Sequence, residues 1–503
     1  MAQRHMDRLS AFDTSFLANE KDNAHMAIGA ILVFDGLPPT EDEFLALIRS
    51  RLHLLPRLRQ RLLTPPLGLG TPFWVDDEIF DVRRHVSRAT LPAPGTDAEL
   101  QALAGRLLSP PLDRRKPLWE LTLVDGFGEA RFAVVYKTHH AMADGISAVD
   151  IGMLLFEVEP TAGPPAPEQP WRPRRSPTSV GLAVRAVTGV AATFRRCLRW
   201  LSGAARDPAA ASRRTGDGLI GLWEVTWNLL RPAPKVPINP AGVGPGRDFC
   251  WATFELAEFK RIKNALGGTV NDVSLAVATG ALRGWLAEEE VATDGVELKA
   301  LVPVSIRTID EHGELGNKLT AMRGPLPIGT DTPEERLRLI STAMDDLKAS
   351  KQPLGAEAIW GLNDWFRDFA PPVLLGPTAA INFSTRLFNL LVTNFPGPQI
   401  PFYALGRELV AIHPVGFLAR RHGLAIAILS YNGGVSFGLL ADPDSVPGVE
   451  RLAEHLEVAV AELSAAASRV APPLASPGDG DQLAGDDRPR FARARERRAA
   501  RRG

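Results

Sequence analysis

Three features are scarce in this sequence: cysteine, long apolar runs and an excess of charge of one sign. Cys197 and Cys250 are the only cysteines among 503 residues, which is too few for a disulfide framework and favours a reducing compartment. No apolar run reaches the roughly 20 residues that cross a bilayer, and residues 1–19 lack the apolar core of a signal peptide. The formal net charge of -1 excludes a generally basic nucleic-acid binder. We therefore expect a cytoplasmic protein that meets a membrane only from one side.

The most informative stretch is a strand followed by a polar turn. Residues 132–136 form a short apolar run that predicts a buried strand, and this strand ends at His139 and His140. Residues 146–157 then favour a helix. The second histidine and Asp144 therefore lie at a strand-to-helix turn, where side chains can face a cleft instead of the core.

A metal site at this turn is disfavoured. Successive side chains of a strand point to opposite faces, so His139 and His140 are expected to diverge and not to share one ion. No CxxC or HExxH motif supplies further ligands, and we predict no metal. A pair of packed or capping histidines is the alternative that the bare HxxxD spacing leaves open.

Other segments carry clear local signals. The runs at 121–125 and 131–138 predict a hairpin. Thr269 and Asn271 are alternative caps for a helix that runs to Glu289. Further elements are expected from periodicity and apolar runs: strands near 30–34, 249–256, 301–307, 410–414, 424–430 and 435–440, and helices at 41–55 after Thr40, 332–350 and 449–468.

The middle and the end of the chain have unusual composition. Residues 160–177 are dense in proline and are interpreted as a linker between two halves. Residues 180–206 predict a basic amphipathic helix, with five arginines within an arc of about 100°. Such a helix either lies in an anionic membrane interface or packs on the protein with its arginines in water, and both alternatives stay open. Residues 488–502 form a basic tail.

Seven motifs occur in a characteristic order along nearly the whole chain. The motifs are PLDRRKPLWE (111–120), HHAMADG (139–145), GGTVNDVSLA (267–276), LVPVSIR (301–307), GNKLT (316–320), VTNFPGP (392–398) and FGLLADPDSVPG (437–448). In this combination the sequence resembles the bacterial wax ester synthase/diacylglycerol acyltransferases, the bifunctional type that makes storage lipids.

The resemblance implies an α/β (α+β) fold of two lobes like that of chloramphenicol acetyltransferase. Each lobe is expected to be a mixed sheet with packed helices, and the active site is expected in a tunnel between the lobes. We expect an N-terminal lobe with the HHxxxDG motif at 1–175, a helical linker with the basic amphipathic helix at 176–246, a C-terminal lobe at 247–473 and a disordered basic tail at 474–503.

The resemblance also implies roles for the residues of the motifs. His140 is expected to be the general base, since a histidine can take a proton from a hydroxyl at neutral pH and return it to a thiolate. His139 is expected to support the loop, and Asp144 to hold the turn by pairing with an arginine. Asn271 is expected to donate to the tetrahedral oxyanion.

Four further residues are expected to be supporting ones. Gly145 opens the turn, and Asp272 completes the Asn-Asp pair of the third motif. Arg307 is the candidate partner of Asp144, and Ser305 is expected to face the tunnel. The family resemblance implies no metal and no cofactor, with acyl-CoA as a substrate.

The expected activity is the transfer of a long-chain fatty acyl group from acyl-CoA to diacylglycerol or to a long-chain alcohol, without a covalent enzyme intermediate. The sequence does not fix the acceptor. Two alternatives stay open: acyl transfer to another alcohol such as a polyketide or glycolipid, and a non-catalytic coat protein of lipid inclusions that binds through residues 180–206. The expected location is cytoplasmic, peripheral on the inner face of the membrane or on lipid inclusions.

Overall fold

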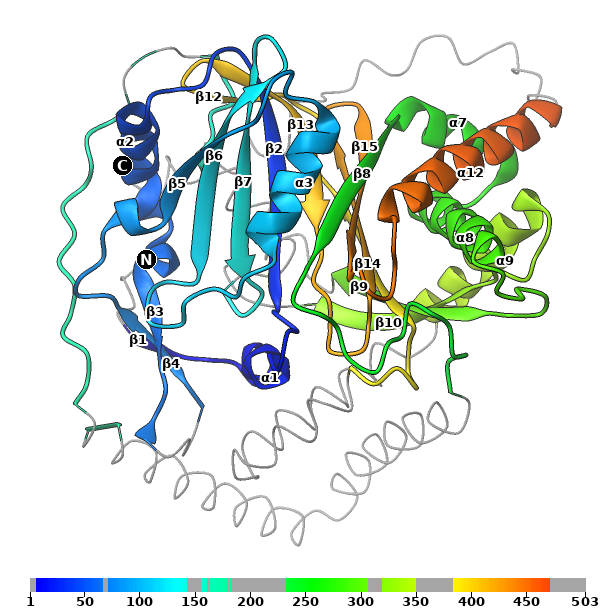
Figure 1. Cartoon of the computed structure of the whole chain (residues 1–503), viewed down its shortest axis with the longest axis horizontal. Helices are drawn as coiled ribbons and strands as arrows, with labels where there is room; N and C mark the ends of the chain where they lie inside the picture. The colour runs from blue at the N-terminus through cyan, green and yellow to red at the C-terminus, as the bar shows by residue number, and fades with distance from the viewer. Residues whose placement is uncertain are drawn as a thin grey trace, which may run out of the picture.

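The fold consists of two lobes that lie side by side (Figure 1). The computed structural model describes residues 6–66, 71–142, 155–160, 163, 165–178, 181–182, 232–305, 319–349 and 383–470. Each lobe is built on one six-stranded mixed sheet within these residues. The predicted two-lobed α/β class is thereby confirmed.

The sheet of the N-terminal lobe is antiparallel except at β5, which runs parallel to β6. Its strands, in spatial order, are β12 (Phe402–Ala404), β13 (Arg407–Val415), β2 (Ala27–Asp35), β7 (Arg131–His139), β6 (Trp119–Phe127) and β5 (Val86–Thr90). In the described residues of this half of the chain, the named helices are α1 (Ala11–Asn19), α2 (Glu41–Arg51) and α3 (Asp97–Leu108). Short 3-10 turns lie at Leu52–Leu54, Pro56–Arg59 and Val82–Arg84.

The strand that carries the histidines is central in this sheet. β7 pairs with β6 in the predicted hairpin and with β2 on its other side. Every residue of β7 after Arg131 is buried, because the strand is covered on both faces. An uninterrupted apolar run predicts a strand that is buried on both faces. A strand with one face exposed to solvent would show alternating apolar and polar residues.

Two strands cross from one half of the chain to the other. β12 and β13 lie within the segment assigned from sequence to the C-terminal lobe, 247–473, yet β13 pairs with β2 and extends the N-terminal sheet. In Figure 1 these strands are drawn in yellow and orange beside the blue β2. The two lobes therefore cannot be separated by dividing the sequence at one position.

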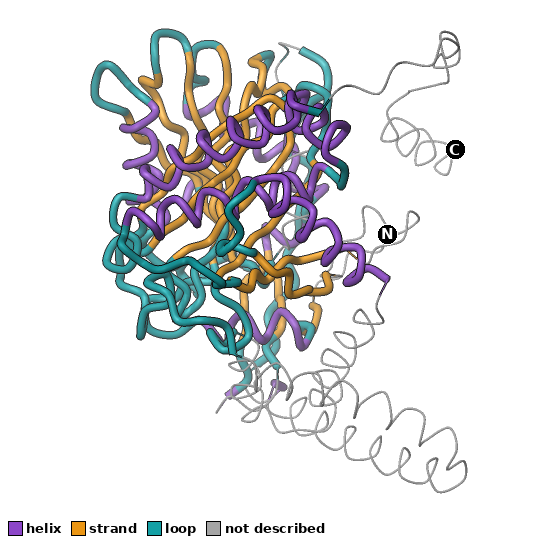
Figure 2. The backbone as a smooth tube through the Cα atoms, turned by 90° about the vertical axis from the view of Figure 1, so that its right-hand side faces the viewer, coloured by secondary structure: helices purple, strands orange, loops and turns teal. Residues whose placement is uncertain are grey.

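The C-terminal lobe is a sheet with helices on its outer face, as Figure 2 shows. Its strands, in order, are β10 (Leu319–Leu326), β9 (Leu298–Ser305), β11 (Leu390–Pro396), β14 (Leu424–Tyr431), β15 (Gly434–Ala441) and β8 (Asp248–Glu255). The helices are α7 (Leu256–Leu266), α8 (Val270–Glu288), α9 (Pro333–Ala349) and α12 (Val449–Arg469).

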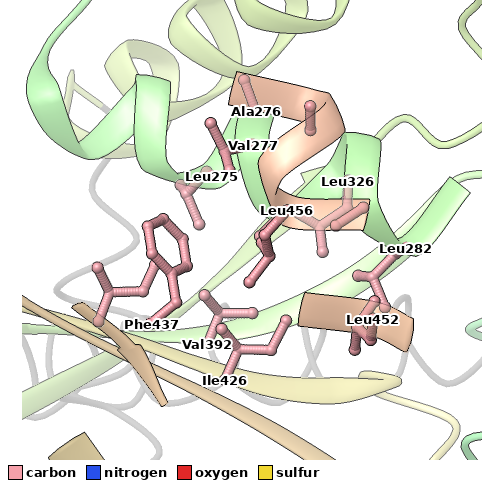
Figure 3. Packing of buried hydrophobic residues seen from close by; sticks show 14 of the residues in the cluster. Leu275, Ala276, Val277, Leu282, Leu326, Val392, Ile426, Phe437, Leu452 and Leu456 are labelled. Carbon is pink, nitrogen blue, oxygen red and sulfur yellow. The ribbon is translucent and has the colours of Figure 1, made fainter. Parts of the chain in front are cut away.

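The core of this lobe lies between the sheet and its helices. Figure 3 shows Leu275 of α8 and Leu456 of α12 on the side of Phe437 and Ile426 of the sheet, and Leu282 of α8 beside Leu452 of α12. These six side chains are at most 1% exposed. Burying a side chain of this size stabilises a fold by about 1.5–3 kcal/mol, so α8 is held firmly along its length.

The proline-rich segment packs on the N-terminal lobe. Residues 165–178 contain no helix or strand, as predicted, but lie against a small sheet of β1 (Met6–Arg8), β4 (Phe73–Asp76) and β3 (Gln60–Leu63). Arg59 forms an ion pair with Glu168 at 2.8 Å and lies over the ring of Trp171. The backbone N–H of Arg174 donates to Asp76 at 3.0 Å. This part of the linker is thus anchored.

One apolar cluster joins the two lobes. It contains Phe16 of α1 and Ile28 of β2 together with Leu391 of β11, Phe417 and Ala425 of the C-terminal half. The lobes therefore share part of their core. In the described part of the chain, no helix is long and apolar enough to cross a membrane.

The remaining predicted elements agree closely with the structure or lie outside it. Most of the helix expected at 146–157, the helix at 180–206 and the basic tail fall outside the described residues. The strand expected at 301–307 is β9, described as far as Ser305. The helix at 41–55 is shorter than predicted, since α2 ends at Arg51 and continues as 3-10 turns.

Candidate active site

The two histidines are fixed at the end of β7 by backbone hydrogen bonds to both neighbouring segments. The N–H of His139 donates to the carbonyl of Leu118 at 3.0 Å, and the N–H of His140 donates to the carbonyl of Met26 at 2.8 Å. The N–H of Met142 then donates back to His139 at 2.8 Å and turns the chain. Both side chains therefore leave a rigid strand end.

His139 is held by hydrogen bonds at both ring nitrogens. Its Nδ1 accepts from the N–H of Ala141 at 3.0 Å, so its Nε2 carries the proton and donates to Glu20 at 3.2 Å. Arg114 Nε donates to the same carboxylate at 3.1 Å. Burial raises the pKa of Glu20, but hydrogen bonds from His139 and Arg114 outweigh it and lower the pKa to about 2. Glu20 is thus a fixed anion behind the turn.

His140 has a different environment, as the divergence of adjacent strand residues predicts. Its ring stacks on Phe16 with centroids 4.0 Å apart and planes at 15°, and meets Phe417 edge-on at 5.3 Å. The side chain is 8% exposed, and among the described residues its Nδ1 has no hydrogen-bond partner. Burial is the main cause that lowers the pKa of His140 to about 3. The imidazole is therefore neutral at pH 7 and can accept a proton.

The Asn-Asp pair lies in the first turn of α8. Thr269 is the N-cap, so of the two predicted caps the structure selects this one. Its hydroxyl accepts from the N–H of Asp272 at 3.2 Å, while Asp272 accepts from the N–H of Thr269 at 2.8 Å. Such a capping box is typical of helix N-termini, so Asp272 stabilises the N-terminus of α8.

Asn271, the next candidate residue, is linked to another motif. Its Oδ1 accepts a hydrogen bond from Nδ2 of Asn394 on β11 at 3.1 Å. Because the contact uses the amide oxygen of Asn271, both hydrogens of its amide nitrogen remain available to another acceptor. Asn394 thereby orients the donor side of Asn271.

The structure brings together only part of the predicted set. Asp144, Gly145 and Arg307 lie outside the described residues, and so does the side chain of Ser305 at the end of β9. No hydrogen bond between described residues joins His140 to Asn271. The pairing of Asp144 with Arg307 and the roles of these residues stay predictions.

A narrow apolar gap lies next to the aromatic cluster. It has no room for a water molecule, and its lining residues are Phe383, Phe388, Leu391, Phe417, Ala419 and His422. Phe417 borders this gap and also meets His140 edge-on.

Four residues of the candidate site were not assigned a role from sequence. Arg114 and Asn394 occur within the motifs, but their partners are distant in the chain and leave no local pattern. Glu20 follows α1, and Phe16 is a buried residue of that helix. No pattern in the sequence indicates that the ring of Phe16 meets a histidine.

Comparison with protein families gives two consecutive matches. Residues 9–274 match the wax ester synthase/diacylglycerol acyltransferase catalytic domain, and residues 315–464 match the C-terminal domain of the same family. The chain belongs to this acyltransferase family. The resemblance drawn from seven motifs is confirmed, and so is the conclusion that the protein is an acyltransferase enzyme.

Relatives of this acyltransferase cover almost its full length. The probable diacylglycerol O-acyltransferase tgs1 of Mycobacterium tuberculosis is 30% identical over 473 residues, which is 92% of this chain and 97% of that protein. The probable diacylglycerol O-acyltransferase tgs2 of the same species is also 30% identical, over 92% of this chain and 99% of that protein.

Solved structures agree with the fold of the family. The wax ester synthase/diacylglycerol acyltransferase from Marinobacter aquaeolei VT8 is 25% identical, with a TM-score of 0.64 over 92% of this chain and 100% of that one. The first condensation domain of the calcium-dependent antibiotic synthetase is 18% identical with a TM-score of 0.59, over 93% of this chain and 98% of that one, and shares the fold.

Metal ligands are not grouped near the turn in the part of the chain that the structure describes. No set of three or more histidine, cysteine or carboxylate side chains is arranged there to hold an ion. His139 uses both ring nitrogens for hydrogen bonds, which leaves it no lone pair for an ion.

Proposed function

We propose that this acyltransferase moves a long fatty acyl group from acyl-CoA to the free hydroxyl of diacylglycerol. Two observations support this acceptor: the curated relatives at 30% identity are named diacylglycerol O-acyltransferases, and they cover more than nine-tenths of the chain. A long-chain alcohol is the second acceptor, because the family and the Marinobacter relative are also named wax ester synthases.

The observation that carries the proposal is the state of His140. The ring is neutral, buried and placed at the end of a rigid central strand. A neutral imidazole has a nitrogen lone pair free to accept a proton, which is what a general base for an alcohol requires.

The proposed reaction has one acyl transfer and no covalent enzyme intermediate. His140 removes the hydroxyl proton as the alcohol oxygen bonds to the thioester carbonyl carbon. The carbonyl oxygen gains the negative charge, and the amide of Asn271 donates to it. The C–S bond then breaks as the C=O bond re-forms, and His140 returns the proton to the CoA sulfur. No metal or cofactor takes part in this proposed sequence.

His139 serves as a support in this scheme. Its two hydrogen bonds connect the turn at Ala141 to Glu20, which Arg114 holds in turn. Asp144, Gly145, Asp272, Ser305 and Arg307 keep the supporting roles that their motifs predict.

We propose a peripheral location on an anionic membrane or on lipid inclusions, because both proposed substrates carry long hydrocarbon chains. The amphipathic helix predicted at 180–206 and the basic tail supply positive charge for this contact. Sedimentation with anionic and with neutral liposomes tests the proposal. Binding should require anionic lipid and should fall when Arg185, Arg195, Arg196, Arg199 and Arg206 are replaced by glutamine; binding that is unchanged would refute it.

The acceptor is tested by product analysis. Purified protein is given labelled palmitoyl-CoA with dipalmitoylglycerol or with hexadecanol, and CoA release and the labelled ester are measured. Triacylglycerol should exceed wax ester at equal acceptor concentration. Formation of wax ester alone would show that the long-chain alcohol is the acceptor. Formation of neither ester would contradict the proposal.

The absence of a covalent intermediate has a separate test. The same protein is incubated with labelled palmitoyl-CoA and no acceptor. Neither stoichiometric CoA release nor label on the denatured protein is expected. A burst of CoA equal to the enzyme concentration would contradict direct transfer.

A further inference from the structure

Two aromatic rings from different halves of the chain enclose the imidazole of His140. Phe16 comes from α1, and Phe417 from the segment between β13 and β14. The two phenyl rings also contact each other, with centroids 5.8 Å apart and planes at 89°. Phe383 lies 5.9 Å from each of them and closes the cluster. The imidazole is therefore one member of a packed aromatic group.

Hydrogen bonds do not set the plane of this imidazole in the described part of the chain. The backbone N–H of His140 bonds to Met26, which fixes the main chain, while Nδ1 has no partner within the described residues. The stacked contact with Phe16 is close, at 4.0 Å and 15°, and rotation of the imidazole about its side-chain bonds would break it. Among the described residues, the aromatic contacts are thus the interactions that select one ring orientation.

We propose that Phe16 is a positioning residue for the general base: its ring, stacked on His140 and backed by Phe417, fixes the imidazole plane and excludes water from one face. The inference rests on the proposed role of His140 in acyl transfer. It adds a residue of α1 to the residues that the reaction needs. It also makes the position of the base depend on a contact between the two lobes.

Several charged groups near the ring have partners in the described part of the chain. Glu20 accepts from His139, and Asp13 accepts from Ser10, the N-cap of α1. Arg420, in the segment that carries Phe417, pairs with Asp22, and Arg131 of β7 pairs with Asp35 of β2. Other titratable or charged groups on the described parts of the adjoining elements include His25, Lys137, Arg386, Arg421 and His422. His139 acts on His140 in the same direction as burial, since both lower the pKa of His140.

The test uses three substitutions in the full chain. Phe16→Leu removes the ring but keeps an apolar side chain, and Phe16→Tyr keeps the ring. Phe34→Leu is the matched control, because Phe34 is also a buried ring of this lobe and stacks on Phe132 at 5.0 Å, away from His140. Phe16→Met, also without a ring, replaces Phe16→Leu if that variant does not fold.

The kinetic result separates positioning from general packing. Phe16→Leu should lower kcat by about 10- to 100-fold with KM within about twofold, since a displaced catalytic group costs turnover more than binding. Phe16→Tyr and Phe34→Leu should keep the kcat of the unchanged protein. An unchanged kcat in Phe16→Leu, or an equal loss in Phe34→Leu, would overturn the proposal.

A readout without substrate keeps the inference separate from the proposed function. In protein labelled at histidine, the His140 ring protons should show the upfield shift that a stacked phenyl ring causes, and Phe16→Leu should abolish this shift while Phe16→Tyr keeps it. Burial lowers the pKa of His140 to about 3, and this pKa should rise in Phe16→Leu because water reaches one face of the imidazole. If the upfield shift is present in protein that transfers no acyl group, the stacking of Phe16 on His140 is supported and the proposed function is rejected. If the shift is missing, the proposed positioning by Phe16 is rejected.

Discussion

Adjacent residues in one motif have separate structural functions in this acyltransferase. His139 and His140 leave β7 on opposite faces, the first toward a carboxylate and the second toward two phenyl rings. The divergence follows from the alternation of a strand and was predictable. The partners were not predictable, because Glu20 lies 119 residues before His139 and no local pattern connects them.

The oriented amide of Asn271 leads to a prediction about rate. Asn271→Ala should lower kcat by about 10²–10³-fold with little change in KM, because a donor to the oxyanion acts only in the transition state. Steady-state kinetics of CoA release measures this. Asn394→Ala, which removes the group that orients Asn271, should give a smaller loss of kcat. Equal activity of Asn271→Ala and the unchanged protein would exclude the oxyanion role.

The anion at Glu20 leads to a prediction about stability and pH. Its pKa falls from 4.5 to about 2 on folding, so its contribution is fully present above pH 4.5 and is lost as the pH falls toward 2. A shift of this size corresponds to at most about 3 kcal/mol. Glu20→Gln should therefore lower the free energy of unfolding in urea at pH 7, by less at pH 4 and least at pH 3.

A surface carboxylate provides the control for that measurement. Glu335 pairs with Arg338 on α9 at 2.6 Å with both side chains exposed, so Glu335→Gln should change the stability little at any pH. A loss in Glu20→Gln that does not depend on pH would show that its charge is not the cause.

At the scale of elements, helix starts were the most predictable features. Thr40 caps α2 as the sequence predicts, and Thr269, one of the two predicted candidates, caps α8; a cap depends on residues only three apart. Strand β7 was predictable for a similar reason, because a run of apolar residues indicates a buried strand without any information about the strands that pair with it. The pairing of Asn271 with Asn394 needed β11 to lie beside α8, which no local rule supplies.

The capping box of α8 allows stability and catalysis to be separated. Thr269→Ala removes the N-cap of the helix that carries Asn271, and Thr96→Ala removes the same capping box from α3. Each variant should lose about 1 kcal/mol of stability. Only Thr269→Ala should also lose kcat, because only its helix end holds a proposed catalytic group.

Thermal melts and CoA-release kinetics on both threonine variants check this. Equal kcat values in the two variants would show that the first turn of α8 does not control the position of Asn271.

At the scale of the whole molecule, the two lobes depend on each other. β13 covers the edge of β2 in the N-terminal sheet, and Phe417 of the following segment touches His140. The sequence predicted two lobes in the right order along the chain. It did not predict the crossing, because the apolar run of β13 fits either sheet equally well.

The crossing strands predict that neither half folds alone. A separately expressed piece of residues 1–246 would expose the apolar edge of β2, and such edges promote aggregation. This piece should be insoluble or unfold without a cooperative transition, measured by circular dichroism during heating. Co-expression with residues 247–503 should restore soluble protein, whereas cooperative unfolding of the first piece alone would contradict the shared architecture.

The central claim is that His140 is the base of the acyl transfer, and its most direct test is CoA release from palmitoyl-CoA and dipalmitoylglycerol by the His140→Ala variant. His455→Ala is the control, since His455 lies on the surface and pairs with Glu288 at 3.0 Å. Release should fall by about 10²–10⁴-fold in His140→Ala and stay unchanged in His455→Ala, with both proteins folded. Near-normal release by a folded His140→Ala protein would contradict the account.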